Sequence, residues 1–224
     1  MEWTLLESRK ETNTTKTLLF KPKTKIDFEP GQYFVFHDLV DGIEDCRAYS
    51  ASSPPTQEHI EITVRLTNTP HFSKHLQELP KGYMIEVKGP YGDFALRGTP
   101  EEIVLISAGS GIVPLRSIMR YVLDSALPTK IILLYSAKTS ESIIFRNELN
   151  KLAQESKIQL LVTLTQEKGA YEGRINADLI KKAVNDVQKP EFFICGPPLM
   201  VKSMLALLAQ LGINSKKVHS EGFA

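Results

Sequence analysis

Two glycines flanking a serine, at residues 109–111, have the pattern of a phosphate-binding turn. They follow a short apolar run, 103–107, which is typical of a strand buried on both faces of a sheet. A segment expected to be helical, 113–125, comes directly after them. Because glycine has no Cβ, the backbone can turn tightly and a ligand can approach it closely. The helix would point its N-terminal amides at the turn, which therefore predicts a site for a pyrophosphate group.

A second turn of this kind is Cys195-Gly196-Pro197-Pro198, about 86 residues further on. Three βα steps separate the two turns, so both are expected at the carboxyl edge of one parallel sheet, where open α/β sheets bind ligands. An arbitrary cysteine is more often a small buried apolar residue. The place of this cysteine at the sheet edge favours a role at the site.

The segment Arg47-Ala48-Tyr49-Ser50 has side chains that suit an anionic aromatic ligand. On a strand, alternation places Arg47 and Tyr49 on one face and Ser50 on the other. An arginine can bind a phosphate and a tyrosine can stack on a ring. The alternative is an exposed pair on a strand with no function.

The first hundred residues alternate in short β-like runs separated by turn residues. Six closely spaced strands with one short helix, at 72–79, predict a six-stranded antiparallel β-barrel. The expected strands are 3–8, 15–20, 33–37, 46–50, 58–66 and 84–88.

The pattern changes after 97–100, Arg-Gly-Thr-Pro, which has the composition of a linker. We therefore expect two domains, 1–97 and 101–224. In the second, apolar runs alternate with amphipathic ones, which predicts an α/β domain with a five-stranded parallel sheet and right-handed crossovers. Its expected strands are 103–107, 130–135, 158–164, 191–195 and 216–219, and its expected helices are 113–125, 143–156, 176–185 and 198–211.

Composition narrows the class of protein. The formal net charge of +1 over 224 residues argues against a generally basic nucleic-acid binder. Cys46 and Cys195 are too few for a disulfide framework or a four-thiolate iron–sulfur cluster. The five histidines show no metal-binding spacing. From this spacing we expect no metal. No apolar run suits a signal peptide or a membrane span, so we expect a cytoplasmic location.

Four blocks of the sequence, taken together, resemble the ferredoxin–NADP reductase superfamily of flavoproteins. They occur in the family's order and span nearly the whole chain. The likeness implies a flavin-binding β-barrel domain and an NAD(P)-binding α/β domain in one chain, without an iron–sulfur domain. The blocks are 47–50 with 53–54, 89–94, 108–114, and 195–198 with Met200.

The resemblance implies that the first domain binds FAD, with FMN as the alternative. Arg47 would pair with the flavin phosphate, Tyr49 would lie against the isoalloxazine ring, and Ser50 would reach toward its N5 atom. Val64 and Arg65 match the strand that lines the cofactor.

The family's pyrophosphate segment is altered in this chain. Relatives usually have glycines before the serine that opens the short helix, whereas this chain has Thr69 and Pro70 there. Backbone amides of Phe72 and Ser73 are still expected to hold the pyrophosphate.

The same likeness assigns the nicotinamide nucleotide to the second domain. It implies that the nucleotide binds at Gly109, Ser110, Gly111 and Pro114, and that its ring lies near Cys195, Gly196 and Pro197. In related reductases an acid and an aromatic residue after the last strand close over the flavin, and Glu221 and Phe223 have that spacing. Ser50, Cys195 and Glu221 are therefore the expected catalytic residues. The alternative for Glu221 and Phe223 is a frayed terminus.

The implied activity is electron transfer from NAD(P)H through bound flavin to a separate acceptor, either a redox protein such as ferredoxin, flavodoxin or an oxygenase component, or a small molecule such as free flavin. The alternative is a non-catalytic flavin-binding relay or regulatory subunit. The choice of nucleotide stays open: Lys138 and Arg146 suit the 2′-phosphate of NADPH, whereas Glu141 or Glu167 would repel it. We expect NADH on this balance.

Overall fold

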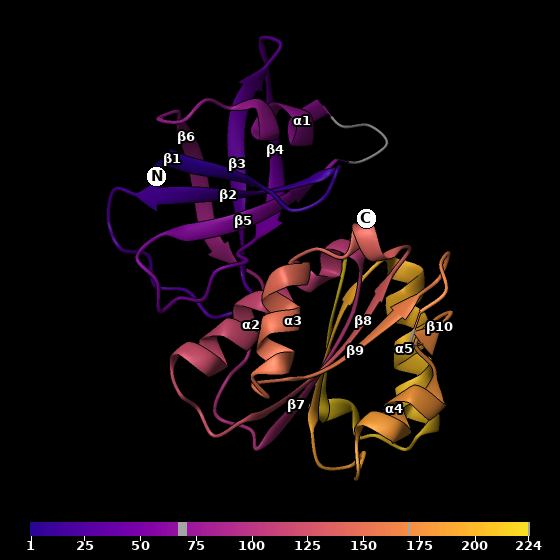
Figure 1. Cartoon of the computed structure of the whole chain (residues 1–224). Helices are drawn as coiled ribbons and strands as arrows, with labels where there is room; N and C mark the ends of the chain where they lie inside the picture. Colours follow the sequence, from indigo (N-terminus) through magenta and orange to yellow (C-terminus); the bar gives the residue numbers. More distant parts are fainter. Residues whose placement is uncertain (67–70, 170, 224) are drawn as a thin grey trace. The chain divides into compact units, whose positions relative to one another are not determined.

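The computed structural model describes residues 1–66, 71–169 and 171–223. These residues form two compact units (Figure 1). The first comprises Met1–Arg97 with Arg116–Ser125, and the second comprises Gly98–Leu115 with Ala126–Ala224. The sequence assigned the segment 116–125 to the second domain, and the domain ranges 1–97 and 101–224 stay a prediction.

The first unit is built on a six-stranded antiparallel sheet, as predicted. Its strand order is β4-β3-β6-β1-β2-β5. Ala51, just after β4, bridges to Ile62 on β5, and the amide of Ser52 donates to the Glu61 carbonyl at 2.7 Å. These contacts join the two edge strands, so the sheet closes into a barrel. Its strands are β1 (Glu2–Lys10), β2 (Thr15–Pro22), β3 (Tyr33–Val40), β4 (Ile43–Ser50), β5 (Ile60–Arg65) and β6 (Met84–Tyr91).

Large aromatic side chains fill the barrel. The ring of Trp3 lies 4.8 Å from that of Phe34 and 5.6 Å from that of Phe36, centroid to centroid, both edge to face. Helix α1 (His71–Glu78) adds Phe72 and Leu76 to this core. The packing holds β3 and β4 in a fixed register, which positions the Arg47–Ser50 segment.

The second unit contains a parallel sheet of six strands, in the order β10-β9-β8-β7-β11-β12. Five were predicted, and the sixth is β10, a two-residue edge strand that pairs with β9. Two residues are too short to show the period of a strand. The strands are β7 (Glu102–Ala108), β8 (Lys130–Ala137), β9 (Gln159–Leu164), β10 (Tyr171–Glu172), β11 (Glu191–Gly196) and β12 (Val218–Gly222).

Helices cover both faces of this sheet (Figure 1). Helices α4 (Ala177–Ala183) and α5 (Pro198–Gln210) pack on the face that carries Val104 and Ile106. The opposite face is covered by α3 (Arg146–Gln154). The predicted caps are confirmed, since the Asn176 side chain accepts from the Leu179 amide at 2.9 Å and Gly212 follows α5 with φ +72°.

Several boundaries differ from expectation, and two of them lie close to the predicted nucleotide site. The helix predicted at 143–156 begins at Arg146 because Phe145 has φ 60°, a left-handed conformation that interrupts a right-handed helix. A 3₁₀ turn, Ser140–Ser142, precedes it. The last strand, predicted at 216–219, is β12, and it contains Glu221 rather than ending before it.

Among the described residues, no helix is long and apolar enough to cross a membrane.

Candidate functional site

The glycine turn lies where the sequence places it, between β7 and helix α2 (Ile112–Asp124). Gly109 has φ +57°, a backbone conformation that residues other than glycine rarely adopt. Gly111 has a different reason to be glycine, because an added Cβ would lie 2.1 Å from the carbonyl oxygen of Cys195. Its missing side chain therefore lets the turn pack directly against the carboxyl end of β11.

The remaining predicted residues of this turn have ordinary positions. Ser110 is partly exposed beside the glycines, and Pro114 is buried in the first turn of α2, where proline is tolerated. The phenol of Tyr135 on β8 donates to the Gly109 carbonyl at 3.0 Å. The turn is thus tied to both strands that neighbour β7.

A row of three polar side chains crosses the carboxyl edge of the sheet. Cys195 on β11 is paired in register with Ser107 on β7 and with Glu221 on β12. In a parallel sheet such paired residues stand side by side on the same face. The Ser107 Oγ and Glu221 Oε2 atoms are buried and have no hydrogen-bond partner among the described residues.

Burial shifts the pKa values of the two titratable groups in this row, Cys195 and Glu221. It raises the pKa of the Cys195 thiol, and the nearby Glu221 carboxylate raises it further, so the thiol stays neutral and is no nucleophile. Burial also raises the pKa of Glu221 to about 7. Glu221 can therefore exchange a proton at neutral pH, a property common in catalytic acids and bases.

Ser107 was missed by the sequence reasoning. Its signal in the sequence is weak, because Ser107 is a single hydroxyl at the end of the apolar run 103–107. Gly196 and Pro197 lie at the β11–α5 turn, as expected, with Pro197 exposed. The amide of Phe223 donates to the Gly196 carbonyl at 2.9 Å, so the chain is held to the sheet up to this residue.

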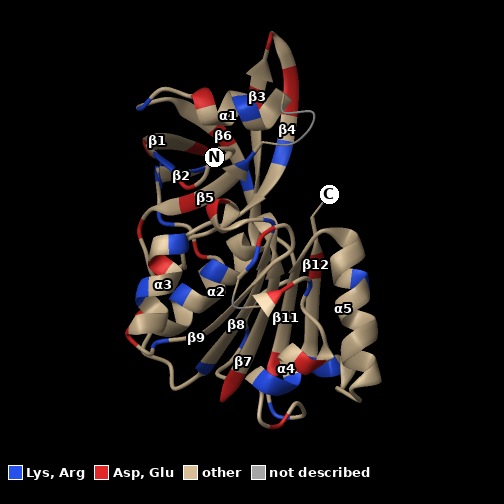
Figure 2. Ribbon diagram, turned by 45° about the vertical axis from the view of Figure 1, so that its right-hand side comes forward, with Lys and Arg blue, Asp and Glu red and all other residues tan. Residues whose placement is uncertain are grey.

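In the first unit, the segment predicted to hold the flavin is the end of β4. Arg47 is exposed, and its Nη1 donates to Asp45 and to the Cys46 carbonyl at 2.5 and 2.6 Å. Figure 2 shows both signs of charge along this strand. Tyr49 is partly buried, with its ring stacked 6.5 Å from that of Phe72, while Ser50 is buried opposite Tyr33.

The other predicted flavin residues lie on β5 and α1. Val64 is buried in the barrel, whereas Arg65, the last residue of β5, is exposed. Phe72 and Ser73 are in the first turn of α1, where the backbone amides point toward the N-terminal end of the helix. Thr69 and Pro70 lie outside the described residues.

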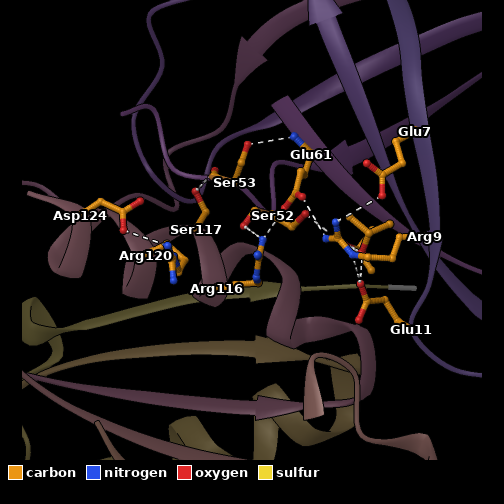
Figure 3. Close-up of polar contacts among 12 residues, drawn as sticks. Glu7, Arg9, Glu11, Ser52, Ser53, Glu61, Arg116, Ser117, Arg120 and Asp124 are labelled. Carbon is orange, nitrogen blue, oxygen red and sulfur yellow. Dashed lines mark hydrogen bonds and ion pairs between the residues drawn. The ribbon is translucent and has the colours of Figure 1, made fainter. Parts of the chain in front are cut away.

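A buried ionic network next to β4 was also missed (Figure 3). The Glu61 carboxylate on β5 accepts from Arg116 on α2 at 2.7 Å and from Arg9 on β1 at 3.0 Å. Arg116 also donates to the carbonyl of Ser52 at 2.8 Å, and Ser117 donates to that of Ser53 at 2.7 Å.

This network fixes the backbone that follows Ser50. Burial alone would raise the pKa of Glu61, but the charges and hydrogen bonds of Arg116 and Arg9 outweigh it and the pKa is lowered. No sequence motif marks the network, because its three ionic residues lie on separate elements far apart in the chain.

Two domain families match the chain. Residues 3–96 match the oxidoreductase FAD-binding domain and residues 105–205 match the oxidoreductase NAD-binding domain. The chain belongs to the ferredoxin–NADP reductase family of NAD(P)H-dependent flavoproteins. The match of the barrel to an FAD-binding family decides between the two flavins that the sequence left open.

Relatives within the ferredoxin–NADP reductase family support the assignment. The chain is 31% identical to an NADPH oxidoreductase of Mycobacterium tuberculosis over 98% of this chain and 59% of that protein. It is 30% identical to the ferredoxin reductase component of a 3-ketosteroid-9-alpha-monooxygenase of Rhodococcus rhodochrous, over 95% and 62%. The chain thus spans less than two thirds of the length of these curated relatives.

The fold of this family member is also seen in solved structures. The FAD/NAD-binding domain of a nitric oxide dioxygenase from Vibrio cholerae superposes with a TM-score of 0.91. The match covers 99% of this chain and 98% of that one at 21% identity.

The described residues fit the two groups that the family binds. The Gly109–Gly111 turn brings bare backbone to the carboxyl edge, beside two buried polar atoms that lack partners. On β4 an exposed guanidinium and a stacked aromatic ring offer a phosphate contact and a ring contact.

Proposed function

We propose that this chain catalyses electron transfer from NAD(P)H through bound FAD to a separate acceptor. The observation that carries the proposal is the arrangement at the carboxyl edge, where Gly111 packs on Cys195 and Glu221 lies beside it. A glycine turn that opens a helix suits a pyrophosphate. FAD, when bound, supplies the redox chemistry, taking a hydride from NAD(P)H and passing its electrons to an acceptor.

The second unit would bind and orient the nucleotide. In this proposal the amides of the Gly109–Gly111 turn and of α2 hold the pyrophosphate, with Ser110 as a further donor. Cys195 gives the nicotinamide ring a compact, uncharged neighbour, because its thiol stays protonated. Correct ring alignment is an orientation effect, so small displacements here should be costly.

The first unit would hold the flavin. Arg47 binds its phosphate, Tyr49 lies against the ring system, and the amides at Phe72 and Ser73 bind the pyrophosphate. Arg65 and the backbone at Val64 would line the same cofactor, since the Val64 side chain lies in the barrel core. Ser50 would donate a hydrogen bond to N5, and Glu221 would supply or accept the accompanying proton.

The acceptor is proposed from the relatives. One of them is named as the ferredoxin reductase component of a monooxygenase, which favours ferredoxin or an oxygenase component, with flavodoxin as a further candidate. A cytoplasmic location remains part of this proposal.

The proposed function predicts that the purified, FAD-loaded chain oxidises NAD(P)H with ferricyanide as an artificial acceptor. Cys195→Ala should slow flavin reduction in stopped-flow measurements while FAD content stays unchanged. A flavin-loaded chain that no nicotinamide nucleotide reduces would favour the alternative, a non-catalytic relay subunit. Loss of flavin from Cys195→Ala would contradict the role assigned to this residue.

A further inference from the structure

Two serines that follow strand β4, Ser52 and Ser53, are completely buried and are called the serine segment below. Strand β5 holds them from one side. The Ser52 amide donates to the Glu61 carbonyl at 2.7 Å, and the Ser53 hydroxyl accepts from the Glu61 amide at 2.9 Å. The Thr63 hydroxyl donates to the Ser52 hydroxyl at 3.0 Å. Both backbone and side-chain groups of the serine segment are therefore tied to β5.

Helix α2 holds the serine segment through its two carbonyl groups (Figure 3). Nη1 of Arg116 donates to the Ser52 carbonyl at 2.8 Å, and the Ser117 hydroxyl donates to the Ser53 carbonyl at 2.7 Å. Both donors are buried, and residues 116–125 belong to the first unit. The same Arg116 nitrogen donates to the Glu61 carboxylate at 2.7 Å, so one guanidinium joins the serine segment to β5.

The serine segment is directly connected to Ser50. Ser50 is the last residue of β4 and is buried opposite Tyr33 on β3. Ala51, the one residue between Ser50 and the serine segment, bridges to Ile62 on β5. The position of Ser50 thus depends on the β3 ladder before it and on the serine segment after it. A displacement of the serine segment is passed on to the Ser50 backbone.

We propose that Arg116 and Ser117 are positioning residues for the reaction, which act by fixing the place of the Ser50 hydroxyl. The inference rests on the proposed function, in which Ser50 donates a hydrogen bond to N5 of the flavin. Arg116 and Ser117 themselves touch no cofactor atom in this proposal, and their effect passes through the serine segment. Because hydride transfer depends on orientation, a displacement of about 1 Å can cost up to about a hundredfold in rate.

Ser117→Ala is the main test, because it removes the hydroxyl that holds the Ser53 carbonyl. Reduction of the FAD-loaded chain at saturating NADH should slow by about tenfold, since the ring contacts stay and only the placement of Ser50 changes. The FAD content should stay at the wild-type level. Thr129→Val is the matched control, because Thr129 is also buried and its hydroxyl donates to a backbone carbonyl, that of Pro100, at 2.6 Å. It should keep the wild-type rate.

A double-mutant cycle shows whether Ser117 acts through Ser50. In Ser50→Ala, which already lacks the hydroxyl, adding Ser117→Ala should cause no further slowing. Arg116→Lys keeps a positive charge for Glu61 but loses the planar guanidinium, so it should also slow reduction and show the same lack of additivity. Equal slowing by Ser117→Ala with and without the Ser50 hydroxyl would overturn the proposal, because a general structural defect does not depend on Ser50.

Two further measurements need no turnover. Hydrogen exchange of the amides of residues 50–53 should be faster in Ser117→Ala than in the wild type and in Thr129→Val. The visible absorbance of the bound oxidised flavin should shift in the same direction as in Ser50→Ala. The absence of either change would overturn the proposal. If no nicotinamide nucleotide reduced the wild type, the proposed function would fail, and these two measurements would still decide whether Ser117 positions Ser50.

Discussion

Glu221 is a half-buried carboxyl whose titration should be visible in the reaction. Its pKa of about 7 results from burial. If Glu221 supplies a proton during flavin reduction, the rate should fall as the pH rises through about 7, because only the protonated form can donate. Stopped-flow reduction by NADH across pH 5.5–8.5 measures this; Glu221→Gln should be slower and lack that transition. The exposed Glu172→Gln should keep the wild-type profile.

The same shift has a consequence for stability. Because the pKa in the folded protein lies above the ordinary value of 4.5, the folded state binds the proton more tightly. The resulting stabilisation is fully present below pH 4.5 and is lost as the pH rises through about 7. Urea unfolding at pH 5 and pH 8 should show a smaller pH effect in Glu221→Gln than in the wild type. An equal effect in both would contradict the burial of this carboxyl.

The close packing of Gly111 against β11 predicts the effect of a larger residue at this position. A Cβ at this position would lie 2.1 Å from a backbone oxygen of β11, so Gly111→Ala must displace the turn. We expect a loss of about 1–3 kcal/mol in the free energy of unfolding, as for overpacked sites, together with weaker nucleotide binding. Gly222→Ala is the control, because its added Cβ would make only ordinary contacts at 3.8 Å.

At the scale of elements, the Glu61–Arg116 pair fastens α2 to the end of β4 and to β5 (Figure 3). Arg116→Met leaves the buried Glu61 carboxylate with only its partly exposed partner Arg9. The free energy of unfolding should therefore fall by about 3–5 kcal/mol. Chemical denaturation measures this loss. The exposed pair of Arg97 and Glu29 is the control, and Glu29→Gln should change stability little.

The pH dependence of this network has the opposite sign to that of Glu221. The pKa of Glu61 is lowered in the folded protein, so its stabilisation is present above the ordinary value of 4.5 and is lost as the pH falls through the native pKa. The stability difference between the wild type and Glu61→Gln should therefore shrink between pH 7 and pH 3. A difference that stays constant over this range would contradict the ionic role of Glu61.

Periodicity predicted the elements well where they are long. Strand β7 and helix α5 were expected within a residue or two, because a buried apolar run and an apolar helix have clear patterns. It missed β10, which has two residues, and placed the start of α3 three residues early, because the left-handed backbone at Phe145 leaves no sequence pattern. The pairing that brings Cys195 beside Glu221 depends on strand register, which local sequence does not encode.

Site residues were predictable in proportion to how local their signal is. The glycine turn and Cys195 follow strands directly, so sequence alone located them at the carboxyl edge. The hydrogen bonds of Glu61 with Arg116 and of Glu167 with Ser140 join residues far apart in the chain. Only the three-dimensional arrangement reveals such partners.

In the whole molecule, the barrel is assigned to flavin and the α/β unit to the nicotinamide nucleotide. Both assignments have a family match. The central claim joins them: electrons pass from the nucleotide to the flavin within this chain.

Anaerobic titration of the FAD-loaded protein with NADH, followed by flavin absorbance, tests that claim most directly. About one equivalent of NADH should bleach the flavin, since a hydride carries the two electrons that FAD accepts. Flavin that stays oxidised in excess NADH and NADPH, while dithionite reduces it, would rule out electron transfer from the nucleotide to the flavin in this chain.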